Sequence, residues 1–363
     1  MPINQHRTAH ATRLARRRPA RRIAAGLLSA TAAAGLVTGV SLAVSPALAS
    51  AAPAGATAGM PRYYVISSHS ESAPLQVRSS ATGRVVSTVT PPAACDPKGL
   101  RVTAAGDDRT FVVGCDTPQS KSEANGFYRL RISSRGHASA LQPLAIRTPY
   151  DDTLNDLALT PDGRQLAIGM QGPGGVPGGP GTLEVVTLAT GRVRTWTGES
   201  PFDLSWAGHG RELGFMLTAG LYALNPNAPG TRLSSAHRVL GRTVGSEGVD
   251  VAELSPDGAT VLASVSSTHL AGPLHRGSVV GGVAEISART GKILRMLAIE
   301  HAHYSADGGG SEAGWYETSC TLGSIDATGH HLLVGCDHFG RLDGTRFTPL
   351  PGVAQDTYFS AAW

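Results

Sequence analysis

The segments LALTPDGRQLAIGM (157–170) and AELSPDGATVLASV (252–265) share one pattern: an apolar stretch, a tight turn, which is Pro-Asp-Gly in both, and a second apolar stretch. SIDATGHHLLVGC (324–336) is a third copy. The turn glycines Gly163, Gly210 and Gly258 lie 47 and 48 residues apart, which is the length of one four-stranded blade of a β-propeller. The repeat therefore predicts an all-β propeller. Looser copies of the pattern are VTAAGDDRTFVVGC (102–115) and LSWAGHGRELGFML (204–217).

A second family of turns alternates with the first along the chain. It is found in SSATGRVVSTV (79–89), LATGRVRTWTG (188–198) and ARTGKILRMLA (288–298). In both families a glycine supplies the positive φ that a tight hairpin needs. A blade therefore reads strand a, Pro-Asp-Gly-type turn, strand b, loop, strand c, Thr-Gly-type turn and strand d.

The number of blades follows from this order. The segments RYYVISS (62–68), PLQVRSS (74–80) and RVVSTVT (84–90) supply strands b, c and d without a strand a. TYFSAAW (357–363) supplies the missing strand, and a ring closed in this way has no free edge strands. We predict a six-bladed β-propeller over 61–363, with a composite first blade closed by the C-terminal strand. The five complete blades begin near Lys98, Leu154, Pro201, Gly248 and Cys320.

The tetrapeptides at 160–163 and 255–258 carry a family resemblance. Ser/Thr-Pro-Asp-Gly followed by apolar residues resembles the WD-like repeats of TolB-type and related bacterial extracytoplasmic propellers, and the resemblance covers nearly all of 61–363. It implies an exported propeller and fixes no single activity, because the family is functionally mixed. The Trp-Asp dipeptide and Gly-His pair of true WD repeats are absent, so no eukaryotic-type scaffold role is transferred.

The first 49 residues have the order of an export signal. A basic region is followed by an apolar run over 23–44 and a small-residue site, Ala47-Leu48-Ala49. We predict a signal peptide over 1–49, a flexible tether over 50–60 and a secreted or extracytoplasmic propeller. An uncleaved N-terminal anchor is the alternative, and the pair Arg21-Arg22 leaves Sec and twin-arginine export both open.

The net positive charge of the full sequence comes from these first 49 residues. The full sequence has 31 basic and 27 acidic side chains, and seven of the basic ones but no acidic one lie in the first 49 residues. The remainder has 24 and 27, a net charge of −3. We therefore expect no nucleic-acid partner, because such a surface has no excess of cations for phosphates. We also expect no membrane span after signal cleavage, no cofactor and a monomer.

The four cysteines occupy equivalent places in two blades. Cys95 and Cys320 precede strand a, whereas Cys115 and Cys336 end strand b in Gly-Cys-Asp. Folding each pair about its midpoint sets the two sulfurs opposite each other. Even number, exported context and mirrored register predict the intrablade disulfides Cys95–Cys115 and Cys320–Cys336. A zinc site is the competing interpretation, although neither pair has CxxC spacing.

The longer connections, b–c and d–a, should emerge together on one face of the ring, where binding and catalytic residues commonly lie. The richest of them, 299–320, contains His301 and His303, which an extended segment would place on one side as a metal site requires. Solvated polar side chains are the alternative. We take as candidate ligand-binding residues on this loop His301, His303, Asp307 and Glu312.

Two further candidates lie in the inner strands. Asp156 and Asp203 occupy matching positions in adjacent blades and could form an acid/base pair or a cation site. Capping of a local backbone group, or pairing with an arginine, is the alternative. The matching positions in the other blades form no symmetric ring: they hold Arg101, Val251, Leu322 and Ser360.

Two functions remain open. The first is a non-catalytic exported propeller that binds a protein, peptide or glycan through its long-loop face. The second is a propeller-type lyase or hydrolase with an acidic and histidine site at the channel mouth, acting with or without a metal ion. The first is favoured because the carboxylates and histidines are scattered among the blades, and because the sequence has no nucleophile elbow or HExxH motif.

Overall fold

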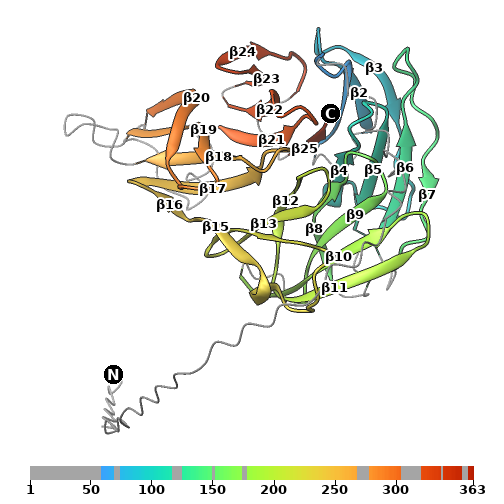
Figure 1. Cartoon of the computed structure of the whole chain (residues 1–363). Coiled ribbons are helices and arrows are strands. Elements are labelled where there is room, and N and C mark those ends of the chain that lie inside the picture. The colour runs from blue at the N-terminus through green and yellow to red at the C-terminus, as the bar shows by residue number, and fades with distance from the viewer. Residues whose placement is uncertain are drawn as a thin grey trace, which may run out of the picture. The chain divides into compact units, whose positions relative to one another are not determined.

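The computed structural model describes residues 59–68, 74–116, 125–148, 152–173, 178–267, 278–303, 320–336, 338–353 and 359–363. These residues form six antiparallel sheets, and each sheet is one blade (Figure 1). The innermost strands contact one another in a closed cycle in the order β4, β8, β12, β17, β21 and β25 (Leu100–Ala104, Thr153–Leu159, Phe202–Ala207, Glu247–Leu254, Thr321–Ile325 and Phe359–Ala362). The predicted six-bladed propeller is therefore confirmed. Each blade is named below after its inner strand.

The remaining elements complete the blades in chain order. The β25 blade adds β1 (Tyr63–Ser68), β2 (Leu75–Ser79) and β3 (Val85–Val89). The β4 blade adds η1 (Pro97–Gly99), β5 (Thr110–Cys115), β6 (Gly126–Arg131) and β7 (Gln142–Pro143). The β8 blade adds β9 (Gln165–Gln171), β10 (Pro180–Thr187) and β11 (Arg192–Glu199).

The second half of the ring follows the same plan. The β12 blade adds β13 (Glu212–Leu217), β14 (Gly220–Leu224), η3 (Leu233–Ser235) and β15 (His237–Gly241). The β17 blade has β16 (Thr243–Val244), β18 (Thr260–Ser267), β19 (Ser278–Ser287) and β20 (Ile293–His303). The β21 blade adds β22 (His331–Gly335), β23 (Phe339–Asp343) and β24 (Arg346–Pro349). In the described part of the chain, no helix is long and apolar enough to cross a membrane.

The core of the molecule lies between the blades. Six clusters of buried apolar side chains each join two neighbouring blades. One cluster, for example, packs Leu183 of the β8 blade with Trp206 and Phe215 of the β12 blade. Because both faces of each sheet are covered in this way, its strands are apolar on both sides near the centre of the ring.

Side-chain and main-chain hydrogen bonds stabilise the Pro-Asp-Gly turn. The Thr160 hydroxyl donates to the Asp162 carboxylate over 2.6 Å, and Gly163 has a φ of 69°. The carbonyl of Pro161 accepts the N–H of Gly106 in the preceding blade, at 2.9 Å. The tetrapeptide at 255–258 repeats this arrangement. It therefore closes a hairpin and also joins two blades.

The C-terminal strand closes the ring as predicted. β25 pairs antiparallel with β1, from Phe359 opposite Ser68 to Ala362 opposite Val65. Trp363 is 3% exposed, and its ring centroid lies 6.4 Å from that of Tyr64. The free edge that strand b of the composite blade would otherwise present is thus covered.

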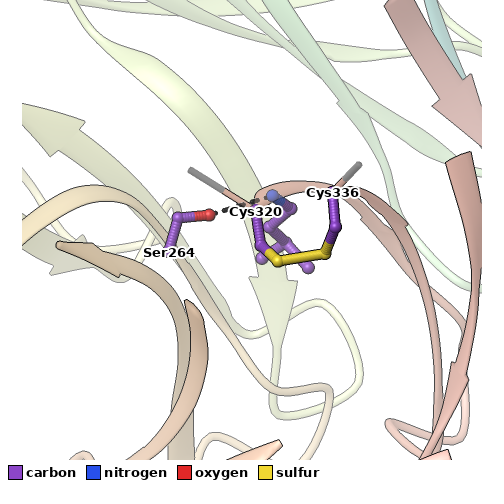
Figure 2. The surroundings of a disulfide bond; sticks show 4 residues. Ser264, Cys320 and Cys336 are labelled. Carbon is purple, nitrogen blue, oxygen red and sulfur yellow. Dashed lines mark hydrogen bonds between the residues drawn. A yellow bond between two sulfur atoms is a disulfide. The ribbon is translucent and has the colours of Figure 1, made fainter. Parts of the chain in front are cut away.

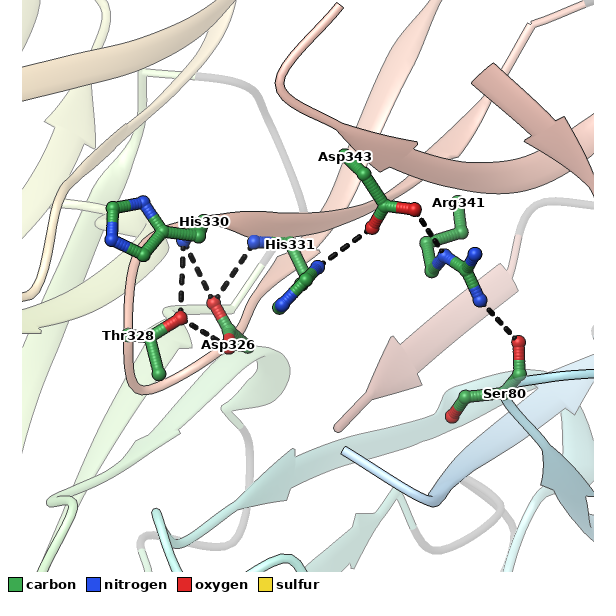
Figure 3. A network of polar contacts seen from close by, with 7 residues as sticks. All are labelled: Ser80, Asp326, Thr328, His330, His331, Arg341 and Asp343. Carbon is green, nitrogen blue, oxygen red and sulfur yellow. Dashed lines mark hydrogen bonds and ion pairs between the residues drawn. The ribbon is translucent and has the colours of Figure 1, made fainter. Parts of the chain in front are cut away.

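Arginines fasten the composite blade to the β21 blade beside it. Arg341 donates from Nη1 to the carbonyl of Ser80, and its Nε bonds to Asp343 (Figure 3). The other oxygen of Asp343 lies 2.6 Å from Nδ1 of His331. Arg78, which is 4% exposed, binds main-chain carbonyls on both sides of the junction. The junction is therefore held by apolar packing together with charge-assisted hydrogen bonds.

Both predicted disulfides are present. Cys320 and Cys336 flank the β21–β22 hairpin, in which Thr321 lies opposite Gly335, so the expected register is correct (Figure 2). Cys95 also bonds to Cys115, but the residue opposite Cys115 is Leu100. The expected register of this pair was therefore wrong. The short helix η1 returns the chain so that Cys95 reaches Cys115 from outside the hairpin.

The fourth complete blade differs from the simple plan. Its sheet has a fifth strand, because β16 pairs with the inner strand β17. Its outer strand β20 continues to His303, so the first residues of the long connection expected over 299–319 extend a strand.

Removing residues 357–363 from the mature chain should lower its melting temperature steeply or cause aggregation. The deletion exposes the edge of β1 and removes the buried Trp363, and loss of one large core aromatic costs about 3–5 kcal/mol against a typical total stability of about 5–15 kcal/mol. Thermal denaturation measures the effect. Deleting residues 50–58, the predicted tether, is the control. An unchanged melting temperature after the C-terminal deletion would refute the ring closure.

Replacing Cys320 and Cys336 together by serine should lower the free energy of unfolding by about 3 kcal/mol, the value expected for a loop of this size. Urea denaturation measures the loss, and reduction of the unmodified protein should lower its stability further because the Cys95–Cys115 bond is also broken. Thiol titration of the denatured, unreduced protein should find no free cysteine. Reaction of any of the four would contradict full pairing.

Candidate functional site

A cavity of about 140 Å³ occupies the channel at the centre of the ring. All six inner strands contribute to it, from the middle of each strand to the a–b turns. Alanines make up much of its wall, among them Ala104, Ala158 and Ala361. Among the described residues that line the cavity, the charged side chains are all carboxylates: Asp108, Asp156, Glu253 and Asp326.

Equivalent places in the blades are counted from the a–b turn. The turn residue with positive φ is Gly163, Gly210, Gly258 or Gly329 in four blades, and Asp108, with a φ of 57°, in the β4 blade. The residue seven places earlier is called position −7 and the residue five places earlier position −5. Asp156 and Asp203 are both at position −7, and Glu253 is at position −5.

Asp156 caps the neighbouring blade. Its Oδ2 accepts the N–H of Leu204 over 2.6 Å, and its Oδ1 accepts the N–H of Leu157 over 2.8 Å. Burial raises the pKa of Asp156 to about 6, although the two hydrogen bonds and the charge of Arg101 oppose the rise. Both oxygens are thus engaged by main-chain donors, which is the capping arrangement weighed above against an acid/base role.

Asp203 repeats the cap at the next junction under more strain. It accepts the N–H of Ala252 in the β17 blade, and its φ of 48° lies in the left-handed region. Its Oδ2 is buried and has no hydrogen-bond partner among the described residues. Burial, followed by the charge of Asp156, raises the pKa of Asp203 well above its ordinary value. The structure therefore brings the two predicted aspartates close enough to repel each other.

A third carboxylate, Glu253, was missed by the sequence analysis. It accepts no hydrogen bond from the described residues, and it lines the cavity. Burial raises its pKa well above the ordinary value, and the charges of Asp203 and Asp156 add to the rise. Searching for a ring of acids at position −7 overlooks it. The signal available was a charged residue between the apolar residues Ala252 and Leu254 of an inner strand.

Two arginines lie near these acids without neutralising them through hydrogen bonds. Arg101, at position −7 of the β4 blade, donates to the carbonyl of Asn155 over 2.8 Å. Arg242 donates to the carbonyls of Thr218, Val249 and Asp250. Their charges lower the pKa values of Asp156 and Asp203, respectively, but less than burial raises them. The pKa values of these acids therefore remain above their ordinary values.

The cavity mouth on the side of the a–b turns is also acidic. Asp326 closes its own turn, since Oδ1 accepts the N–H groups of His330 and His331 (Figure 3). Asp108 takes the left-handed turn position that glycine fills elsewhere, and its side chain accepts no hydrogen bond from the described residues. Burial raises the pKa of Asp108, and the nearby charge of Asp326 raises it further.

The remaining candidate residues, His301, His303, Asp307 and Glu312, are not among the described residues that line this cavity. His301 and His303 lie on β20, the outermost strand of its sheet, where they pair with Val280 and Ser278. Their side chains, together with Asp307 and Glu312, lie outside the described residues. In the part of the chain that the structure describes, no three His, Cys, Asp or Glu side chains lie together as a metal site requires.

Comparisons with known proteins support the fold alone. No protein-family model matches the chain, and no curated protein is similar enough in sequence to count as a relative. A putative TolB from Agrobacterium tumefaciens is 13% identical, with 80% of this chain and 89% of that one aligned at a TM-score of 0.42. A putative 6-phosphogluconolactonase from Bacteroides fragilis is 13% identical, with 84% and 85% aligned at 0.43.

A third similar structure is the β-propeller domain of Cps50 (Swd1) from Myceliophteria thermophila, which is 12% identical over 65% of this chain and 69% of that one, at a TM-score of 0.39. A TolB protein and a β-propeller domain are thus among the similar solved structures. Scores this low carry no argument about activity. The fold assignment depends on the six sheets and their closed order.

Replacing Glu253 by glutamine should stabilise the protein at pH 8. A carboxyl with a higher pKa in the folded state makes folding take up protons, so its unfavourable contribution grows as the pH rises above the ordinary value of 4.5. The variant removes this contribution without losing a hydrogen bond. We expect a gain of about 1–3 kcal/mol at pH 8, the usual cost of a buried polar group without a partner, and little gain at pH 5.

Urea denaturation at pH 5 and pH 8 measures this difference. Asp250→Asn is the matched control, because Asp250 is an exposed carboxylate on the same strand. A Glu253→Gln variant that is less stable than the unmodified protein at pH 8 would show that the carboxylate has a stabilising partner.

Proposed function

We propose that this protein is an exported, non-catalytic binding module. The main support for the proposal is the hydrogen bonding of Asp156, because each of its two carboxylate oxygens accepts a main-chain N–H. A general acid or base needs an oxygen free to reach a substrate proton. With Asp156 used to join two blades, the pair Asp156 and Asp203 is better suited to building the ring than to acid/base catalysis.

The binding face that we propose is the rim of the b–c and d–a connections, with a protein, peptide or glycan as the ligand. In the described residues the a–b and c–d hairpins close through short turns, such as those at Gly163 and Gly191. The strand ends on the opposite rim are separated in the sequence by longer intervals, including 268–277 and 304–319. A rigid ring that carries long loops on one face is the usual design of a binding surface.

An extracytoplasmic location fits the cysteine chemistry. Both pairs of cysteines are oxidised in the structure, and structural disulfides persist mainly in oxidising compartments. The predicted signal peptide over 1–49 leads to the same location. After its removal the net charge of −3 makes a peptide or glycan a more suitable ligand than a nucleic acid.

The test is a binding screen with the mature protein and two variants. The first variant replaces 304–319 by a Gly-Ser segment of equal length, and the second carries Ala81→Glu and Ala189→Glu on exposed c–d turns. Immobilised peptides and glycans are probed with each protein, and any ligand found is measured by calorimetry. We expect the first variant to lose about tenfold or more in affinity, since interface residues of this kind are worth 1–3 kcal/mol each, and the second to bind normally.

Two outcomes contradict the proposal. Loss of binding in the turn variant with retention in the loop variant would move the site to the other rim. A stoichiometric metal ion in the purified mature protein, together with hydrolysis or elimination of a screened ligand, would replace the binding module by the catalytic alternative.

A further inference from the structure

Glu253 is a partly buried carboxylate that accepts no hydrogen bond from the described residues. At position −5 the β4 and β12 blades have Thr103 and Ser205, and each hydroxyl accepts a main-chain N–H of the next blade over 2.9 Å. Glu253 takes this place in the β17 blade and accepts no such bond. A side-chain cap onto the β21 blade comes from Ser264 of β18, whose hydroxyl accepts the N–H of Leu322, nearer the start of β21, over 2.9 Å (Figure 2).

The carboxylate is therefore free for a ligand, and the cavity has room for one. One water needs about 10–15 Å³ on the measure by which the cavity holds about 140 Å³, so a short aliphatic chain can enter. Alanines make up much of the wall, and Trp206 and Trp363 are also among the residues that line it. The cavity thus combines an acidic interior with walls that suit methylene groups.

The charge and spacing of the acids select the kind of cation. Among the described residues that line the cavity none is basic, so a positive group meets attraction from Asp108, Asp156, Glu253 and Asp326 without competition. Divalent metal ions need several oxygens within about 2.0–2.6 Å of one point, and the described acids form no such group. A single ammonium group, whose three donors can bond to one carboxylate and to main-chain carbonyls, fits better.

We propose that the channel cavity binds a primary ammonium group on an aliphatic chain, which enters between the a–b turns and bonds to Glu253. The ligand is either a free aliphatic diamine or the lysine side chain of a peptide, since both present the same chemistry. Asp108 and Asp326 attract the cation at the mouth, and Asp156 adds to the negative potential inside. The site lies on the opposite rim from the binding face proposed above and goes beyond that function.

Binding at this site should release protons. The charges of Asp203 and Asp156 act on Glu253, and Asp108 and Asp326 line the same cavity. The charges of Arg101 and Arg242 lower the pKa values of the two position −7 aspartates. Glu253 therefore holds a proton more readily than an exposed glutamate and must lose it to pair with an ammonium group. Alkylammonium ions keep their charge to about pH 10, so affinity should rise between pH 5 and pH 8.

Calorimetric titration of the mature protein tests the site with 1,5-diaminopentane and with the peptide acetyl-Gly-Lys-Gly-amide, and 1-pentanol is the uncharged control ligand. Glu253→Gln should weaken binding about tenfold or more, the usual scale for a charge-assisted hydrogen bond, while Asp250→Asn leaves it unchanged. Asp108→Asn, at a position where asparagine tolerates positive φ, should weaken binding by a smaller factor. It gives a second test that does not depend on the inner strand.

Tighter binding of the diamine assigns the site to a free amine, and tighter binding of the peptide assigns it to a lysine side chain. Either result supports the proposal when Glu253→Gln abolishes it and when affinity rises with pH. The proposal is overturned if neither amine binds, if 1-pentanol binds equally well, if Glu253→Gln binds as tightly as the unmodified protein, or if CaCl2 displaces the amine stoichiometrically.

Discussion

The propeller depends on how the inner strand of each blade satisfies its unpaired edge. Apart from the short pairing of β16 with the start of β17, an inner strand has a sheet neighbour on one side only, so the N–H groups on its other side face the centre of the ring without sheet partners. Short side chains of the preceding blade supply acceptors at fixed places. Position −7 caps the next blade in Asp156, Asp203 and Ser360, and position −5 does so in Thr103 and Ser205. These hydrogen bonds hold neighbouring blades together and fix their spacing.

Local signals in the sequence decide which parts of the structure could be predicted. The hairpins and the composite blade follow from local signals, namely turn glycines and alternating apolar residues, and both were predicted. The register beside Cys320–Cys336 was correct, although a bulge between Leu322 and Ser324 shifts the pairing nearer the turn. That of Cys95–Cys115 was wrong because η1, three residues long, has no hydrophobic pattern that reveals it. β16 was missed for the same reason, since it contains only two residues.

The candidate site was harder to predict, because it is assembled across blades. Asp156 and Asp203 were found by comparing equivalent positions, but that comparison could not show that their carboxylates face main-chain donors of the following blade. Glu253 lies two places away from them in the repeat and is close to them only in space. A repeat alignment therefore separates residues that the ring brings together, and the charges of the three acids interact although no sequence pattern links them.

The side-chain caps between blades also indicate why an unpaired acid persists at Glu253. A glutamate at position −5 is too long to make the short cap that Thr103 and Ser205 make, and its burial opposes folding as the pH rises. A smaller hydroxyl residue would restore the regular pattern without that cost. Ser264 already caps the β21 blade from another strand, so the ring does not need Glu253 for its closure. Glu253 destabilises the fold and is not needed to build the ring, so its presence is best explained by binding of a ligand. The negative charge of the cavity and its small apolar side chains favour an alkylammonium ion as that ligand.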